Sequence, residues 1–134
     1  LQSDRGVVAA SRVNRGRLER VAVEAAKQCG RGHLLQIAAP ATLQEVASEA
    51  RDVRLIAAPA ALGEGPTVQS LRAARRVLIL VGPEGGWTDH EMHTARRAGA
   101  VPWQFGPHVM RIETACCAAA AIVRYLARDA ASLP

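Results

Sequence analysis

Aromatic residues, cysteines and long apolar runs are all scarce in this sequence, and each shortage excludes something. Aromatic residues are only 3% of the 134 residues, so a core must be built mainly from alanine and branched aliphatic side chains. The longest apolar run, residues 115–123, is about nine residues long, which is too short to cross a bilayer as a helix. We therefore predict no membrane partner and a cytoplasmic location.

The three cysteines are too few and too irregularly spaced for a zinc site. Cys116 and Cys117 lie in an alanine-rich run with helical periodicity, so we predict that both are small core residues. His90 and His93 suggest a metal site, but zinc-binding helices place their histidines four residues apart and no third ligand is evident here. No metal is predicted.

Lysine is nearly absent, because Lys27 is the only one among the 17 basic residues. The 12 acidic residues leave a net charge of +5. The planar guanidinium of arginine suits phosphate groups, so a nucleic-acid partner is reasonable. A GC-rich genome, which encodes arginine and alanine readily, explains the same composition, and charge alone leaves the partner open.

Apolar periodicity predicts strands that alternate with helices. We expect strands at residues 6–9, 34–37, 53–57, 77–81 and 101–105, and helices at 17–29, 42–50, 68–74, 88–98 and 111–128. Thr42 with Glu45, and Thr88 with Glu91, have the spacing of capping boxes. The continuously apolar run 77–81 is typical of a central parallel strand. This alternation predicts an α/β fold with a mainly parallel sheet flanked by helices.

Two loops follow predicted strands at their carboxyl ends, which is the edge of a parallel sheet where ligands usually bind. Residues 82–86 read Gly-Pro-Glu-Gly-Gly, and these glycines let the backbone approach a ligand closely. Residues 105–114 read Phe-Gly-Pro-His-Val-Met-Arg-Ile-Glu-Thr. Either loop alone is also compatible with a structural turn. We expect Trp87 to cover the glycine loop and Trp103 to belong to the core.

Taken together, the two loops resemble a known family. The order Leu-Val-Gly-Pro-Glu-Gly-Gly at 80–86, Thr-x-x-Glu at 88–91 and Phe-Gly-Pro-x-Val-Met-Arg-x-Glu-Thr-Ala at 105–115 is similar to the 16S rRNA (uracil-N3)-methyltransferases. That family belongs to the knotted SPOUT superfamily. Residues 4–8 and 24–31 resemble two further stretches of its sequence pattern.

The resemblance implies a C-terminal trefoil knot whose loops hold S-adenosylmethionine. The residues that it assigns to the cofactor are Leu80, Gly82, Glu84, Gly85, Gly86, Phe105, Gly106, Val109, Met110 and Thr114. Arg111 and Glu113 would be catalytic, the first stabilising the developing uracilate and the second accepting a proton. An ion pair at the start of a helix is the structural alternative for these two residues.

The resemblance also implies partners. Arg5, Arg31 and His108 would contact RNA, the substrate would be 16S rRNA in the small ribosomal subunit, and the enzyme would act as a homodimer. Family members begin with a PUA-like RNA-binding domain and a strand–helix segment. We therefore expect residues 1–134 to be a SPOUT methyltransferase domain without those parts.

Two positions depart from the family pattern. His108 stands where arginine is usual, and Ile112 replaces a threonine. These departures leave open a degenerate relative that binds cofactor or RNA without activity. A tRNA methyltransferase of the same superfamily is a further alternative.

Overall fold

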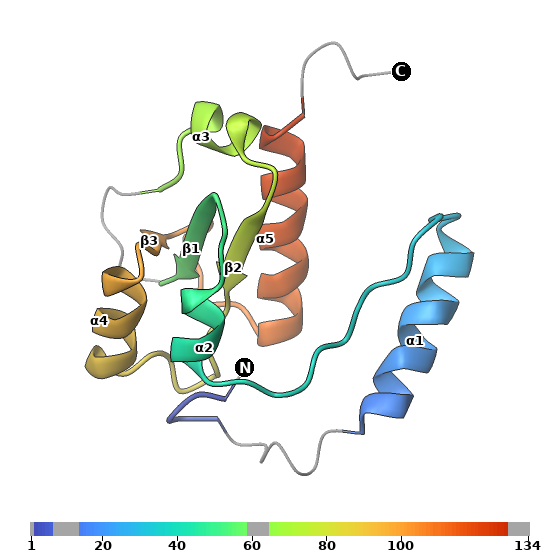
Figure 1. Ribbon diagram of the computed structural model, residues 1–134, viewed down its shortest axis with the longest axis horizontal. Helices are drawn as coiled ribbons and strands as arrows, with labels where there is room; N and C mark the ends of the chain where they lie inside the picture. Colours follow the sequence, from blue (N-terminus) through green and yellow to red (C-terminus); the bar gives the residue numbers. More distant parts are fainter. Residues whose placement is uncertain (1, 7–13, 59–64, 129–134) are drawn as a thin grey trace.

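The computed structural model in Figure 1 contains a three-stranded parallel sheet and describes residues 2–6, 14–58 and 65–128. The strands are β1 (Val53–Ala57), β2 (Val77–Leu80) and β3 (Val101–Trp103). β1 pairs in parallel with both neighbours, which gives the order β2-β1-β3. The predicted α/β fold with a parallel sheet is confirmed, while the knot stays a prediction.

Among the described residues the central strand is β1, and β2, which was expected to be central, lies at an edge of the sheet. Within the described residues β2 pairs only with β1, and of its four residues only Leu80 is buried. β1 carries the charged Arg54, whose guanidinium donates to three backbone oxygens at the end of α2 and just after it, those of Ala47, Glu49 and Arg51. Apolar content reports what covers the faces of a strand and not what pairs with its edges.

The helices begin and end close to the predicted positions. They are α1 (Arg15–Gln28), α2 (Leu43–Ser48), α3 (Val68–Ala73), α4 (Asp89–Arg97) and α5 (Ile112–Leu126). Both predicted capping boxes are present. The side chains of Thr42 and Thr88 accept hydrogen bonds from the backbone N–H groups of Glu45 and Glu91, and the two glutamate side chains accept from the backbone N–H groups of the threonines. No helix in the described ranges is long and apolar enough to span a membrane.

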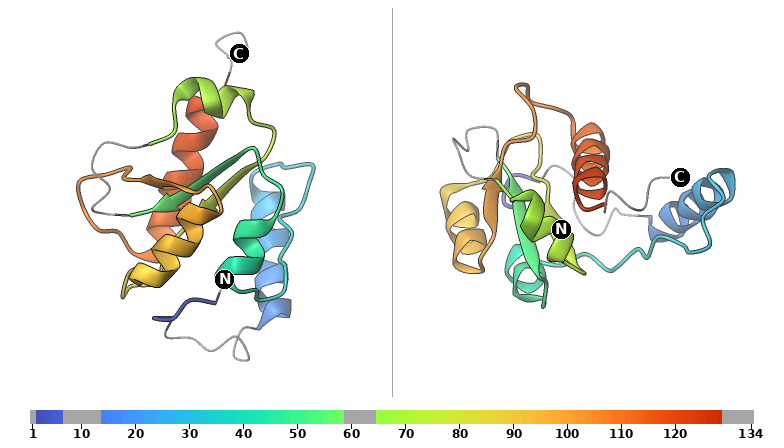
Figure 2. Two further views of the ribbon diagram at one scale, coloured as in Figure 1. Left: turned by 60° about the vertical axis from the view of Figure 1, so that its left-hand side comes forward. Right: turned by 90° about the horizontal axis from the view of Figure 1, so that it is seen from above.

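Helices cover both faces of the sheet, as Figure 2 shows from two sides. On one face α2 and α4 pack over Ile56 and Leu80. On the other, α3 and α5 pack over Leu55 and Trp103, which confirms Trp103 as a core residue. The alternation of strand side chains between the two faces therefore divides the core into two clusters.

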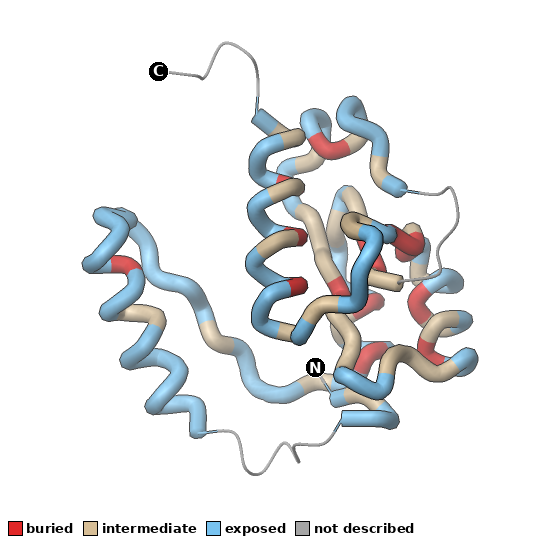
Figure 3. Tube along the Cα trace, turned by 180° about the vertical axis from the view of Figure 1, so that it is seen from behind, coloured by how far each residue is buried: buried red, intermediate tan, exposed pale blue. Residues whose placement is uncertain are grey.

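Cys116 and Cys117 are exposed, so the prediction that they are core residues was wrong. The buried residues of α5 are Ala115, Ala119 and Val123, spaced four apart along one stripe. The cysteines fall beside this stripe, on the outer side of α5 that Figure 3 shows as largely exposed. In a run of small residues, periodicity does not decide which of several similar faces is buried.

α1 lies to one side of the sheet and is exposed along most of its length (Figures 1 and 3). The strand predicted at residues 34–37 is absent: the segment has no regular structure, and Leu34 and Leu35 are 58% and 64% exposed. A short apolar run becomes a strand only where a neighbour satisfies its backbone, and this run has none among the described residues. Of the strand predicted at residues 6–9, only Gly6 lies within the described residues, and it has no regular structure.

Candidate functional site

A cavity of about 300 Å³ lies at the carboxyl edge of the sheet, where the chain leaves all three strands. Ala57 and Ala58 line it after β1, residues 81–87 after β2, and residues 103–106 and 108–110 after β3. Ile112 and Ala115 of α5 close the remaining side. The two loops singled out in the sequence therefore face one another across a single cavity, at the position where parallel sheets usually bind ligands. Its volume is at the lower end of the range for small-molecule sites.

Most of the residues expected to bind a cofactor line this cavity. They are Gly82, Glu84, Gly85, Gly86, Phe105, Gly106, Val109 and Met110, and His108 joins them. Leu80 does not, because its side chain is buried in the core between the sheet and α2 and α4. Thr114 is exposed in the first turn of α5 and does not line the cavity either.

The residues expected to be catalytic lie at the rim. Arg111 is the N-cap of α5 and Glu113 is in its first turn, and both are exposed. Ile112, between them, lines the cavity. The ion pair considered as an alternative does not form between them in the structure. Neither residue lines the cavity itself, so their place beside it rests on Met110 and Ile112, which do.

The residues expected to bind RNA do not form one surface. His108 lies in the cavity wall, and Arg5 bonds to the glycine loop. Arg31 follows α1, to one side of the sheet (Figure 1). Arg5 therefore contacts the protein itself rather than pointing freely into solvent.

The glycines of the cavity make room for side chains of this same chain. A Cβ on Gly82 would lie 2.9 Å from Cε2 of Trp87, and one on Gly85 would lie 3.2 Å from Cβ of Arg5. Gly86 has open space but a φ of +70°, which side-chain-bearing residues rarely adopt. The sequence interpretation assigned these glycines to close approach of a ligand, whereas the structure shows that Trp87 and Arg5 occupy the space beside two of them.

Trp87 fixes the glycine loop to the central strand. Its indole Nε1–H donates to the backbone oxygen of Ala57 at 2.9 Å, and its ring packs against the core beneath α4. The prediction that Trp87 covers this loop is confirmed by these contacts. Across the cavity, the ring of Phe105 lies 4.7 Å from that of Trp103, centre to centre, so the second loop is also anchored to the sheet.

Among the described residues, Glu91 in the first turn of α4 is buried although it is charged, with 4% of its surface exposed. Its carboxylate accepts from the backbone N–H groups of Thr88 at 2.8 Å and Asp4 at 2.9 Å. Burial alone would raise the pKa of Glu91, but these hydrogen bonds outweigh it, and the pKa lies below its ordinary value. Glu91 is therefore a charged anchor for the start of α4.

The sequence analysis missed the contribution of β1. Ala57 and Ala58 line the cavity although neither carries a reactive group. The available signal was positional, because residues 53–57 were recognised as a strand and all parallel strands end at the same edge. Within the described ranges, no three His, Cys, Asp or Glu side chains gather as they would to hold a metal ion.

Fold and site together define a ligand-binding α/β domain whose cavity is built from glycine-rich loops at the carboxyl edge of a parallel sheet. Residues 1–124 match the model of the RNA methyltransferase domain family, and the chain belongs to this family.

Relatives of known name and structure agree with this assignment. Ribosomal RNA small subunit methyltransferase E from Synechocystis sp. is 28% identical over 94% of this chain and 43% of its own length. The crystal structure of a probable rRNA-methyltransferase from Porphyromonas gingivalis is 31% identical with a TM-score of 0.79, over 93% of this chain and 53% of that one. Ribosomal RNA small subunit methyltransferase E from Neisseria gonorrhoeae, bound to S-adenosyl methionine, is 26% identical with a TM-score of 0.75. The match covers 92% of this chain and 52% of that one. The chain thus spans about half the length of these relatives.

Proposed function

We propose that this chain forms the cofactor-binding and catalytic part of an enzyme that transfers a methyl group from S-adenosylmethionine to N3 of a uridine in 16S rRNA. The observation that carries the proposal is the meeting of residues 82–86 and 105–110 around one cavity at the carboxyl edge of the sheet. The name of the Neisseria relative, and the cofactor bound in its crystals, support methyl transfer to rRNA, while the uridine and its N3 position are what the sequence resemblance implies.

The walls of the cavity suit this cofactor. Phe105, Val109 and Met110 offer an apolar surface for an adenine ring. The glycine loop lines the same space, so its backbone lies close to where the ribose and amino-acid groups would bind. Glu84 adds a negative charge, which favours a cationic ligand. When bound, S-adenosylmethionine supplies a methyl group that its sulfonium already activates.

The protein has three tasks in this reaction. Arg111 stabilises the negative charge that develops on the uracil oxygens, assisted by the positive end of the α5 dipole. Glu113 accepts the N3 proton, and the freed N3 electron pair bonds to the methyl carbon as the bond from that carbon to sulfur breaks and S-adenosylhomocysteine leaves. The apolar lining around Ile112 keeps water away from the reacting atoms.

The proposed assembly is a homodimer that acts on the small ribosomal subunit in the cytoplasm. Two exposed apolar side chains support a second copy as partner. Val109 lines the cavity yet is 80% exposed, and Tyr125 on α5 is 72% exposed. A second copy seated on α5 would cover both side chains and complete the mouth of the cavity. Arg31 and His108 would then contact rRNA at the rim, and the C-terminal trefoil knot would join the two loops.

A methyl-transfer assay tests this function. The protein is incubated with labelled S-adenosylmethionine and isolated small ribosomal subunits, and the rRNA is digested to nucleosides and analysed by mass spectrometry. We expect 3-methyluridine, and we expect Arg111→Ala to lower its rate of formation by about 10²-fold while the protein remains folded. Labelled tRNA instead of 16S rRNA would favour the tRNA alternative, and cofactor binding without any transfer would favour a degenerate binding module.

A further inference from the structure

The short segment of residues 2–6 lies against the glycine loop and the start of α4, more than eighty residues later in the chain. The N–H of Asp4 donates to Glu91 Oε1 at 2.9 Å, and the hydroxyl of Thr88 donates to Asp4 Oδ2 at 3.1 Å. Gln2 pairs with the chain just before α2 through its N–H, which donates to the oxygen of Ala41 at 2.8 Å. This segment is therefore anchored at Gln2 and at Asp4, the residue immediately before Arg5.

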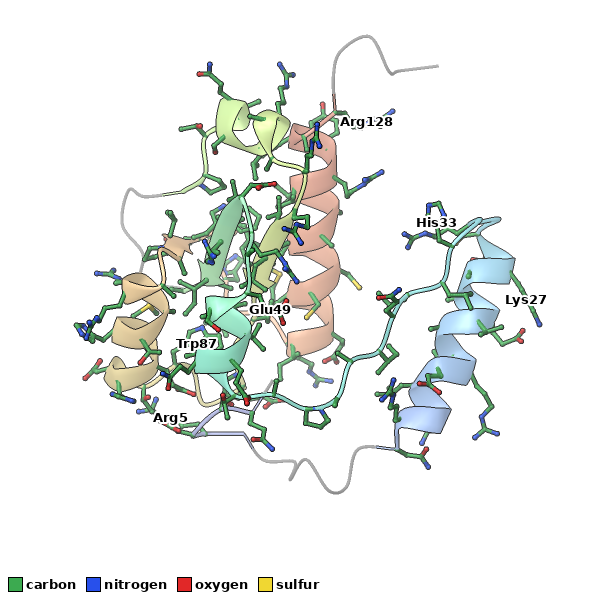
Figure 4. All side chains as sticks on the ribbon, viewed as in Figure 1. Arg5, Lys27, His33, Glu49, Trp87 and Arg128 are labelled. Atoms are coloured by element: carbon green, nitrogen blue, oxygen red, sulfur yellow. The ribbon has the colours of Figure 1, made fainter. Side chains whose placement is uncertain are left out.

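Arg5 contacts the cavity wall directly. Its Nη1 donates to the backbone oxygen of Gly85 at 2.8 Å, and its Cβ lies 3.2 Å from where a Gly85 Cβ would be. Gly85 itself lines the cavity. Figure 4 shows Arg5 beside the turn that leads into α4. The guanidinium thus lies on the outside of the same loop whose inner side forms the pocket.

The glycine loop needs restraints of this kind, because two successive glycines have far more backbone freedom than other residues. On one side, the N–H of Gly86 donates to the oxygen of Pro83 at 2.9 Å. On the other, Trp87 is fixed to β1 through Ala57. Arg5 adds a second restraint to the peptide between Gly85 and Gly86, whose N–H already bonds to Pro83, and its charge makes the hydrogen bond to the Gly85 oxygen stronger than one from a neutral donor.

We propose that Arg5 is a positioning residue for the cofactor pocket: it holds the Gly85 carbonyl and so pre-forms the wall built by residues 82–86. This role replaces the RNA contact that the sequence resemblance implies for Arg5. The choice of ligand rests on the proposed function, whereas the restraint itself does not. A pre-formed wall favours binding because the loop does not have to be ordered when the ligand arrives.

Three variants test the proposal. Arg5→Ala removes the donor, Arg5→Lys keeps a cationic donor, and Arg72→Ala removes an equally exposed charge from α3, whose residues do not line the cavity. Two measurements are made on each without RNA: hydrogen exchange of residues 82–88 in the absence of any ligand, and calorimetric titration with S-adenosylhomocysteine.

For Arg5→Ala we expect faster exchange confined to residues 82–88 and an affinity about three- to tenfold lower, the effect of losing one exposed charge-assisted hydrogen bond. In Arg5→Lys, the exchange rate and the affinity should both return most of the way to the wild-type values. Arg72→Ala should match the wild type in both. Unchanged exchange and unchanged affinity in Arg5→Ala would overturn the proposal. If the wild type failed to bind S-adenosylhomocysteine, the proposed function would fall, and the exchange measurement would still decide the role of Arg5.

Discussion

At the scale of single residues, the site depends on contacts within the chain that motif recognition did not reveal. The sequence resemblance assigned Gly82 and Gly85 to the cofactor, and both line the cavity. In the structure their missing side chains make room for Trp87 and Arg5. A glycine in a motif records that a Cβ is not tolerated, and it does not say which neighbour excludes it.

Gly82→Ala tests this interpretation. The new methyl would lie 2.9 Å from the Trp87 ring, which is held by its bond to Ala57, so the ring or the loop must shift. We expect a loss of about 1–3 kcal/mol in the free energy of unfolding, measured by urea titration. Gly32→Ala is the matched control, since a Cβ there meets nothing within 4 Å and should change stability little. Equal stability of the two variants would contradict the packing described here.

Glu91 predicts a pH dependence of stability. Its pKa is lowered in the folded protein, because the hydrogen bonds from Thr88 and Asp4 outweigh burial. The stabilisation is therefore complete above the unfolded-state pKa of about 4.3 and is lost as the pH falls through the folded-state value. Unfolding free energies of the wild type and Glu91→Gln should differ near neutral pH and converge as the pH falls below 4.3. A difference that stayed constant with pH would rule out the charged form as the stabilising one.

At the scale of helices and strands, local sequence signals were sufficient to predict an element where its backbone groups bond to residues next to it in the chain. The capping boxes at Thr42 and Thr88 placed two helices correctly, because a cap is made within four consecutive residues. The failures concern partners distant in sequence. The position of β2 in the sheet, the exposure of Cys116 and the missing strand at 34–37 all depend on which surfaces meet.

The packing of α3 on α5 gives a test at this scale. Leu71 is fully buried in the cluster that also contains Ala119 and Val123, whereas Val68 on the same helix is 42% exposed. Leu71→Ala should lower the free energy of unfolding by about 2–5 kcal/mol, measured by chemical denaturation. Val68→Ala should cost far less. Comparable losses in both variants would mean that α3 is not packed as described.

At the scale of the whole molecule, the sequence predicted α1 from its apolar periodicity but not its surroundings. Leu18 and Val21 of this helix are 43% and 59% exposed, so its apolar side faces solvent rather than the sheet. Periodicity reports that a helix has a side fit for burial, and the burying surface must come from elsewhere. The pocket, in contrast, was predictable in outline, because parallel strands bring their carboxyl ends together whatever else surrounds them.

The central claim is that the cavity between residues 82–86 and 105–110 binds S-adenosylmethionine. Calorimetric titration tests it most directly, with S-adenosylmethionine and S-adenosylhomocysteine as ligands, ATP as control ligand and Gly106→Val as control protein. A Cβ on Gly106 would lie 3.2 Å from Cε of Met110, so the larger valine should push Met110 into the cavity. We expect saturable binding of the first two ligands, no binding of ATP, and at least tenfold weaker binding to Gly106→Val, which corresponds to about 1.4 kcal/mol. Equal affinity of the folded variant and the wild type would contradict this placement of the site.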